Sequence, residues 1–199
     1  MQIKNGSRSS TSVHRTSFFV VNAITLYRLL SSFALLYFII TSQLSVFKWL
    51  LPVSFLTDTV DGFLARKYKV TSAAGSRIDS IADDLTVFMA IVGIFVFQRD
   101  FIQQEKLVVL ILAGFYLLQL TLAFLKYGKP TSFHTYLAKC AAVLQAVFLV
   151  LFFHLSHTPP FIFYLAASVT LLDLLEESIL VILLPKWTAD VKGLYWALK

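Results

Sequence analysis

Long apolar runs dominate the sequence and limit the folds open to it. Hydrophobic residues make up 58% of the chain and charged residues 14%, which leaves too few charged side chains to cover a soluble globule. Six runs approach the roughly 20 residues that a helix needs to cross a bilayer. They are residues 18–41, 46–65, 78–97, 107–125, 137–153 and 161–184. The pattern predicts an all-α integral membrane protein with six transmembrane helices.

The six runs fill the chain and leave no room for a second domain. We expect a cytoplasmic N-terminal segment at 1–17, a six-helix domain at 18–185 and a cytoplasmic C-terminal tail at 186–199. The segment 1–17 is polar and basic, like the first part of a signal peptide. However, the apolar run after it is longer than a signal-peptide core, and no small-residue cleavage site closes it. An uncleaved first helix is therefore expected.

Lysine and arginine are distributed unequally among the connections between the runs. They gather before the first run, after the second, after the fourth and after the sixth, whereas the connection after the fifth has His154 and His157 but no Lys or Arg. Because basic loops tend to stay in the cytoplasm, both termini should be cytoplasmic. The small size and the lack of a targeting segment favour a plasma (inner) membrane. Anionic lipid head groups, rather than nucleic acid, then account for the net charge of +6.

Four aspartates stand at helical spacing within this apolar sequence. Asp58 and Asp61 are three residues apart, and Asp79 and Asp83 are four apart, so each pair shares one face of its helix. The two pairs should face each other across a helical hairpin. Acids in or near a bilayer are costly and by default functional. Four crowded carboxylates need positive charge between them, and oxygen-only ligands favour Mg²⁺ or Mn²⁺.

Small residues accompany the acids. Gly62 and Ala65 lack bulk, so a ligand or a neighbouring helix can approach the backbone closely. Two divalent ions commonly clamp the attacking and leaving oxygens of a phosphoryl displacement. The residues alone therefore predict metal-dependent chemistry on a phosphorylated, lipidic substrate. The alternative at this point is a salt-bridge cluster of the acids with Arg66, Lys67 and Arg77 at the membrane interface.

The stretch 58–83 reads D-x2-D-G-x2-A-R-x8-G-x3-D-x3-D and resembles the signature of the CDP-alcohol phosphotransferases in every fixed position and gap. Asn22, Thr25 and Arg28 are similar to the first-helix motif of that family, although valines stand where a proline is frequent. The fixed positions of the signature are Asp58, Asp61, Gly62, Ala65, Arg66, Gly75, Asp79 and Asp83.

The resemblance implies transfer of a phosphatidyl group from CDP-diacylglycerol to a small polar alcohol, with release of CMP, in a homodimeric enzyme. It implies that the four aspartates bind two Mg²⁺ or Mn²⁺ ions and that Asp83 is also the general base for the acceptor hydroxyl. Arg66 would face the diphosphate. The residues implied in binding the nucleotide or donor are Asn22, Thr25, Gly62, Ala65, Arg66 and Gly75.

The acceptor is not specified by this signature. Gly128 and Lys129, followed by Thr131, resemble a loop of phosphatidylglycerophosphate synthases, so glycerol 3-phosphate is the first expectation. Inositol phosphate, inositol and serine are alternatives. Positive-inside charge without any acceptor role is a plainer interpretation of the same cations. The candidate acceptor-binding residues are Arg77, Lys126, Lys129 and Lys139.

Three further acids, Asp173, Glu176 and Glu177, lie within the sixth run. Acids at this depth must face protein or water, so we expect them to pair structurally, with Lys126, Arg28 or Lys139, rather than to contact substrate. Two other classes remain open. An aspartate-rich intramembrane prenyltransferase ordinarily needs more spans and acid motifs on two helix pairs, and an ion transporter or non-catalytic scaffold does not need the small residues beside the aspartates.

Overall fold

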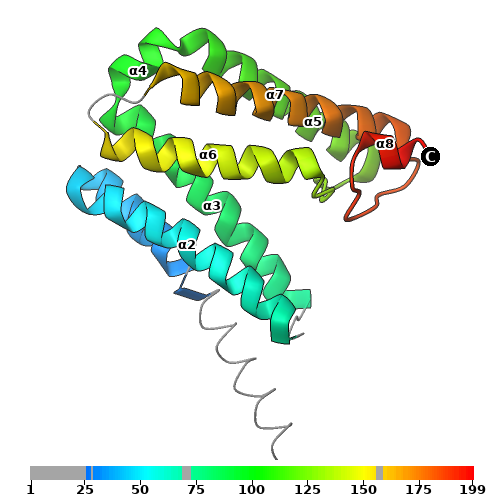
Figure 1. Cartoon of the computed structure of the whole chain (residues 1–199), viewed down its shortest axis with the longest axis horizontal. Helices are drawn as coiled ribbons and strands as arrows, with labels where there is room; N and C mark the ends of the chain where they lie inside the picture. The colour runs from blue at the N-terminus through cyan, green and yellow to red at the C-terminus, as the bar shows by residue number, and fades with distance from the viewer. Residues whose placement is uncertain (1–25, 28, 69–72, 156–158) are drawn as a thin grey trace, which may run out of the picture. The chain divides into compact units, whose positions relative to one another are not determined.

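The computed structural model describes residues 26–27, 29–68, 73–155 and 159–199, and within them the side chains of residues 58–84 are not described. All regular secondary structure in the described residues is helical (Figure 1), which confirms the all-α class. The number of membrane spans and the cytoplasmic termini stay predictions. The chain divides into two compact units, Met1–Arg99 and Asp100–Lys199, and each is described by itself.

The first unit contains a helical stretch, Leu29–Ile40, followed by α2 (Leu44–Tyr68) and α3 (Ala73–Phe97). Ser42 has a φ of 54° in the short turn that joins the first of these helices to α2. Helices α2 and α3 lie side by side as a hairpin (Figure 1). Their bounds contain the predicted runs 46–65 and 78–97 and exceed them at the hairpin connection.

Small polar and apolar side chains pack these helices together. Ser54 of α2 donates a buried hydrogen bond of 3.2 Å from its Oγ to Ser31 Oγ on the preceding helix. Phe47 is fully buried, and its ring lies 5.4 Å from that of Phe97, centroid to centroid. The same ring lies against Gly93 of α3, where a β-carbon would come within 2.6 Å of it. The absence of a side chain at Gly93 therefore lets α3 approach α2 closely.

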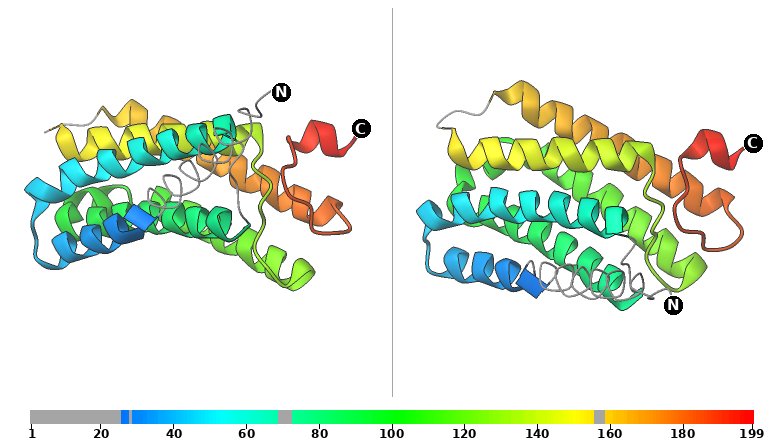
Figure 2. Two further views of the ribbon diagram at one scale, coloured as in Figure 1. Left: turned by 90° about the horizontal axis from the view of Figure 1, so that it is seen from below. Right: turned by 60° about the horizontal axis from the view of Figure 1, so that its bottom comes forward.

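The second unit contains α5 (Lys106–Tyr127), α6 (Tyr136–His154), α7 (Pro160–Leu183) and the short α8 (Leu194–Ala197). A further short helix, α4 (Arg99–Gln104), lies at the boundary between the units. Helix α7 packs against both α5 and α6 (Figure 2). Phe101 of α4 stacks against aromatic rings of α6 and α7, with its centroid 4.6 Å from Phe152 and 5.0 Å from Phe163.

The helix ends of this unit follow from local residues. Gly128 ends α5 with a φ of 69°, and its N–H donates to Phe124 O. This left-handed conformation is easily reached only by glycine and is common after the last helical turn. Thr135 begins α6, and its hydroxyl accepts a hydrogen bond from Ala138 N. The loop between α5 and α6 is thereby fixed at both ends.

By length and composition, α5 and α6 are the two described helices that could cross a membrane. Shorter apolar stretches occur at Leu29–Ile40, Leu44–Thr57 and Leu85–Phe97. Helix α7 has 24 residues and carries Asp173, Glu176 and Glu177. Large apolar side chains are widely exposed, with Leu125 81% and Phe161 72% accessible. Such a surface suits contact with lipid better than contact with water.

Candidate functional site

The four predicted metal-binding aspartates lie on two adjacent helices. Asp58 and Asp61 are ten and seven residues before the last residue of α2, and Asp79 and Asp83 are six and ten residues after the first residue of α3. The two pairs are thus at similar distances from the hairpin connection. Their side chains are outside the described set, so the predicted ligand geometry stays a prediction.

The other residues of the signature share these two helices. Gly62, Ala65 and Arg66 lie on α2, and Gly75 and Arg77 lie on α3. Their side chains are also outside the described set. Asn22 and Thr25 lie outside the described residues altogether. The structure therefore brings the signature to one hairpin, whereas the predicted contribution of the first helix is untested.

Described side chains next to the signature show how α2 packs against the preceding helix and α3. Ser54, one turn before Asp58, is 2% exposed and makes the hydrogen bond to Ser31. On α3, Thr86 lies one turn after Asp83 and is 4% exposed. Small buried residues at these levels allow close helix packing.

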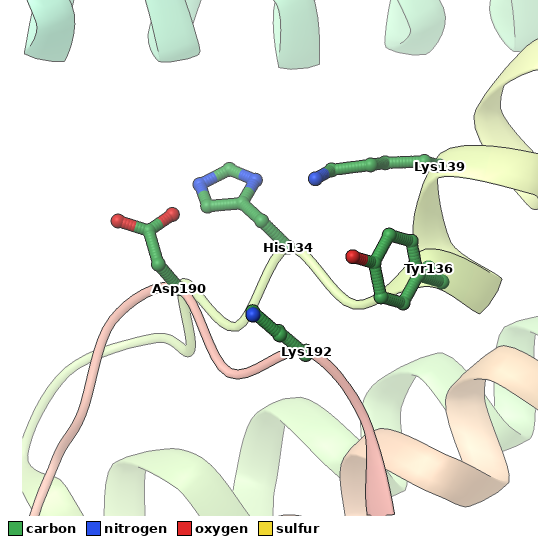
Figure 3. Close-up of a pocket in the computed structure, with 5 residues that line it drawn as sticks. All are labelled: His134, Tyr136, Lys139, Asp190 and Lys192. Carbon is green, nitrogen blue, oxygen red and sulfur yellow. The ribbon is translucent and has the colours of Figure 1, made fainter. Parts of the chain in front are cut away.

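The candidate acceptor-binding lysines of the second unit have different surroundings. Lys126 Nζ donates to Ile182 O at 2.9 Å, at the end of α7. Lys129 Nζ lies 3.6 Å from the centroid of the Trp187 ring, which is a close cation–π contact. Lys139 lies in a pocket with side chains from two separate segments (Figure 3). Lys126 and Lys129 therefore hold the end of α7 and the segment after it.

The acids of α7 are held mainly by neutral donors. Glu177 Oε2 accepts hydrogen bonds from Gln119 Nε2 at 2.8 Å and from Thr131 Oγ1 at 3.0 Å. Glu176 Oε1 accepts one from Leu194 N at 2.9 Å. The structural role expected from the sequence is thus seen for the two glutamates, but neither Lys126 nor Lys139 is their partner. Arg28, the third expected partner, lies outside the described residues.

Two acid oxygens of α7, Asp173 Oδ1 and Glu176 Oε2, are buried without a hydrogen-bond partner. Even so, the side chains that the structure describes include no group of three His, Cys, Asp or Glu residues arranged to hold a metal ion. The acids of α7 are therefore not such a group. The predicted metal ligands on α2 and α3 are among the residues whose side chains are not described.

Sequence reasoning missed the residues around Lys139. His134, Tyr136, Asp190 and Lys192 line the same pocket, and two of them come from the segment between α7 and α8. The sequence shows Lys192 only as one cation in a basic tail. No local pattern places this tail against the loop before α6, because that contact joins residues more than fifty positions apart.

A largely apolar chain whose described secondary structure is all helical, with paired acids on neighbouring helices, has the features of a membrane enzyme. The chain belongs to the CDP-alcohol phosphatidyltransferase family, whose model matches residues 18–175. It is therefore a transferase by family. The apolar helices and the family together indicate a membrane protein.

A curated relative supports this assignment. The CDP-diacylglycerol–inositol 3-phosphatidyltransferase of Saccharomyces cerevisiae is 29% identical to this chain over 79 residues, which are 40% of this chain and 36% of the yeast protein. The match thus spans just over a third of the relative's length. No solved structure matches the chain significantly.

Proposed function

We propose that the protein transfers a phosphatidyl group from CDP-diacylglycerol to a small polar alcohol, in a metal-dependent reaction of phospholipid biosynthesis that releases CMP. The observation that carries this proposal is the complete signature on the α2–α3 hairpin, within a family match over residues 18–175. The reaction takes place at the cytoplasmic face of the plasma membrane, in a homodimer.

The chemistry divides among the residues of the signature. Asp83 takes the proton from the acceptor hydroxyl, whose oxygen forms a bond to the phosphorus that carries diacylglycerol. The bond between that phosphorus and the oxygen of CMP breaks, and CMP leaves with the electron pair. Arg66 faces the diphosphate. Gly62, Ala65 and Gly75, together with Asn22 and Thr25 of the first helix, provide the space and contacts for cytidine.

The residues present fit a site for two divalent ions. Four aspartates are placed at similar distances from the hairpin connection on α2 and α3, and the segment contains no Cys or His, a donor set suited to Mg²⁺ or Mn²⁺. Asp58, Asp61, Asp79 and Asp83 would hold these ions. When bound, such ions offset the charge of the diphosphate and of the leaving group.

Two acceptors have specific support. Glycerol 3-phosphate is favoured by the Gly-Lys loop before α6, which resembles that of phosphatidylglycerophosphate synthases. Inositol is favoured by the name of the yeast relative, and inositol phosphate shares features of both alcohols. Serine remains a weaker alternative. We place glycerol 3-phosphate first because the basic residues around Lys139 suit an acceptor that carries a phosphate.

An acceptor panel tests the proposed function. The purified protein is incubated in detergent with CDP-diacylglycerol and Mg²⁺ or Mn²⁺, and CMP is measured with each alcohol in turn. CMP should form only when the correct acceptor and a divalent ion are both present. No CMP with glycerol 3-phosphate, inositol, inositol 1-phosphate or serine would contradict the proposal.

The general base is tested by neighbouring substitutions. Asp83→Asn keeps the size of the side chain but removes its basicity, so CMP release should fall at least a hundredfold. Asp84→Asn is the matched control, because Asp84 is outside the signature and points about 100° away on an ideal helix. It should retain activity within about tenfold. Equal losses in both variants would indicate a general effect of charge rather than a base at Asp83.

A further inference from the structure

A pocket of about 190 Å³ lies in the second unit, between the loop before α6 and the segment before α8 (Figure 3). Asp190 N donates a hydrogen bond to Ser132 O at 3.1 Å, and Tyr136 N donates one to Lys192 O at 3.2 Å. These two backbone bonds join the segments on either side of the pocket. The pocket is lined by His134, Tyr136, Lys139, Asp190 and Lys192.

The backbone at this pocket is held in an uncommon conformation. His134 has a φ of 53° and Asp190 a φ of 56°, values that residues with a β-carbon seldom adopt. His134 lies between Phe133 and Thr135, both of which are fully buried. The buried residues on either side therefore hold the backbone of His134 in this conformation. Such conformations are often found where a binding site requires a side chain at a fixed place.

The segment before α8, which carries Asp190 and Lys192, is anchored by α7. Glu176 of α7 accepts a hydrogen bond from Leu194 N, two residues after Lys192. Gly193 is in the left-handed half of backbone space, with a φ of 147°, and a β-carbon there would lie 3.1 Å from Glu176 Oε1. The close approach of Gly193 to this carboxylate holds the segment that carries Lys192 and Asp190 in its position beside the loop before α6.

The side chains of the pocket combine cations with one acid. Lys139 and Lys192 have no ion-pair partner among the side chains that the structure describes, although Lys139 Nζ lies 5.5 Å from the centroid of the Tyr136 ring. Figure 3 shows the ends of Lys139 and His134 directed toward each other, with Asp190 beside His134. His134 Nε2 is hydrogen-bonded to Ser132 Oγ at 3.1 Å.

This arrangement matches a particular class of ligand. Two ammonium groups suit the oxygens of a phosphate, which accept charge-assisted hydrogen bonds from lysine. The carboxylate of Asp190, in the same pocket, repels phosphate but accepts hydrogen bonds from hydroxyl groups. A molecule with both a phosphate and free hydroxyl groups meets both requirements, whereas inorganic phosphate meets only the first.

We propose that this pocket binds the phosphate monoester of a hydroxyl-bearing alcohol, and that the C-terminal segment is part of the site because it supplies Lys192 and Asp190. The ligand is either a free phosphorylated alcohol or the head group of a lipid phosphate monoester. If it is the free alcohol, it is the acceptor of the transfer reaction, and that role rests on the proposed function.

Direct binding to the full-length protein tests the pocket without relying on catalysis. Calorimetry in a neutral detergent measures the affinity for glycerol 3-phosphate and for inositol 1-phosphate, with glycerol and inorganic phosphate as comparisons. Lys192→Met should weaken binding of the phosphate esters about tenfold, the loss expected for one charge-assisted hydrogen bond. Lys186→Met removes the same charge from the same tail outside the pocket and should change affinity less than twofold.

A second variant predicts a change in the opposite direction. Asp190→Asn removes the repulsion of phosphate while keeping a side chain that tolerates a positive φ. It should strengthen binding of inorganic phosphate and reduce the preference for glycerol 3-phosphate over it. If Lys192→Met and Lys186→Met have equal effects and Asp190→Asn leaves this preference unchanged, the pocket proposal is wrong.

The source of the phosphate is distinguished with nanodiscs. Discs of phosphatidylcholine alone are compared with discs that also contain phosphatidic acid, a lipid phosphate monoester. If phosphatidic acid competes with the free esters in a way that depends on Lys192, the ligand is a lipid head group. If the free esters bind in a Lys192-dependent way in plain discs and phosphatidic acid does not compete, the ligand is soluble. Either result supports the pocket, and Lys192-independent binding in both kinds of disc overturns it.

CMP release, measured in parallel, separates this proposal from the proposed function. CMP release with an acceptor, when neither the free phosphate esters nor phosphatidic acid bind in a Lys192-dependent way, would overturn the pocket alone. Conversely, Lys192-dependent binding of phosphate esters without CMP release from any acceptor would contradict the transferase proposal and leave the pocket in place.

Discussion

Gly93 of α3 shows how one missing side chain determines helix packing. The fully buried ring of Phe47 on α2 occupies the space beside it, and a β-carbon at position 93 would lie 2.6 Å from Phe47 Cζ. The ring cannot turn aside without displacing its buried neighbours, because protein interiors are closely packed. The contact sets the distance between the two helices that carry the aspartates.

A pair of matched glycine substitutions tests this contact. Gly93→Ala should lower stability by about 1–3 kcal/mol, because the added methyl group overpacks the interface with Phe47. Gly114→Ala, in α5, adds the same group where no other atom lies within 4 Å. It should be neutral or stabilise the helix by up to about 1 kcal/mol. Thermal unfolding in detergent measures both, and equal behaviour of the two variants would refute the packing argument.

Single residues also show which parts of a site can be predicted from sequence. The aspartates were identified because helical spacing is local, and their placement on α2 and α3 agrees with it. By contrast, the positive φ values of His134 and Asp190 follow from the contact between two distant segments. A lysine in a basic tail carries no sign of such a contact, so Lys192 could not be selected in advance.

Helix α7 organises the second unit through polar contacts on several sides. Its Glu177 bonds to Gln119 of α5 and to Thr131 of the loop, and its Glu176 bonds to the backbone of Leu194 in α8. Burying an acid is costly unless donors satisfy it. Through these bonds Glu176 and Glu177 fasten surrounding segments to the helix.

The attachment of α8 can be tested at Gly193. Gly193→Ala combines an unfavourable φ of 147° with a β-carbon 3.1 Å from Glu176 Oε1, so the segment 184–199 should detach from α7. Limited proteolysis should then cut this segment several-fold faster, with weaker binding of glycerol 3-phosphate. Thr188→Ala is the control, because it removes only a hydrogen bond to Lys186 O in the same segment. Unchanged proteolysis of Gly193→Ala would show that Glu176 does not anchor the tail.

The hydrophobic runs predicted the long helices of the second unit together with their ends. The runs 107–125, 137–153 and 161–184 correspond to α5, α6 and α7 within three residues at each end. Helix α2 continues past its apolar run to Tyr68, because a helix can extend through residues that leave the hydrocarbon layer. No apolar run predicts the short α4 and α8. Contacts with distant residues hold them instead: Phe101 of α4 stacks on Phe163, and Leu194 N of α8 bonds to Glu176.

At the scale of the whole molecule, the basic residues predict how the chain is oriented in the membrane. Lys126 and Lys129 lie at the connection between α5 and α6, whereas residues 155–159, between α6 and α7, contain no Lys or Arg. The positive-inside rule therefore predicts that the α5–α6 loop and the C-terminal tail are cytoplasmic. Both segments of the proposed pocket would then face the compartment that supplies soluble phosphate esters.

Reporter fusions in a bacterial host measure this orientation. Green fluorescent protein fused after Lys199 should fluoresce, because it folds in the cytoplasm, and alkaline phosphatase fused there should be inactive. Alkaline phosphatase fused after Leu155 should be active, because that connection is expected outside. The opposite pattern would place the pocket on the outer face, away from the phosphorylated alcohols of the cytoplasm. It would contradict the proposed reaction even if the fold and the family assignment stand.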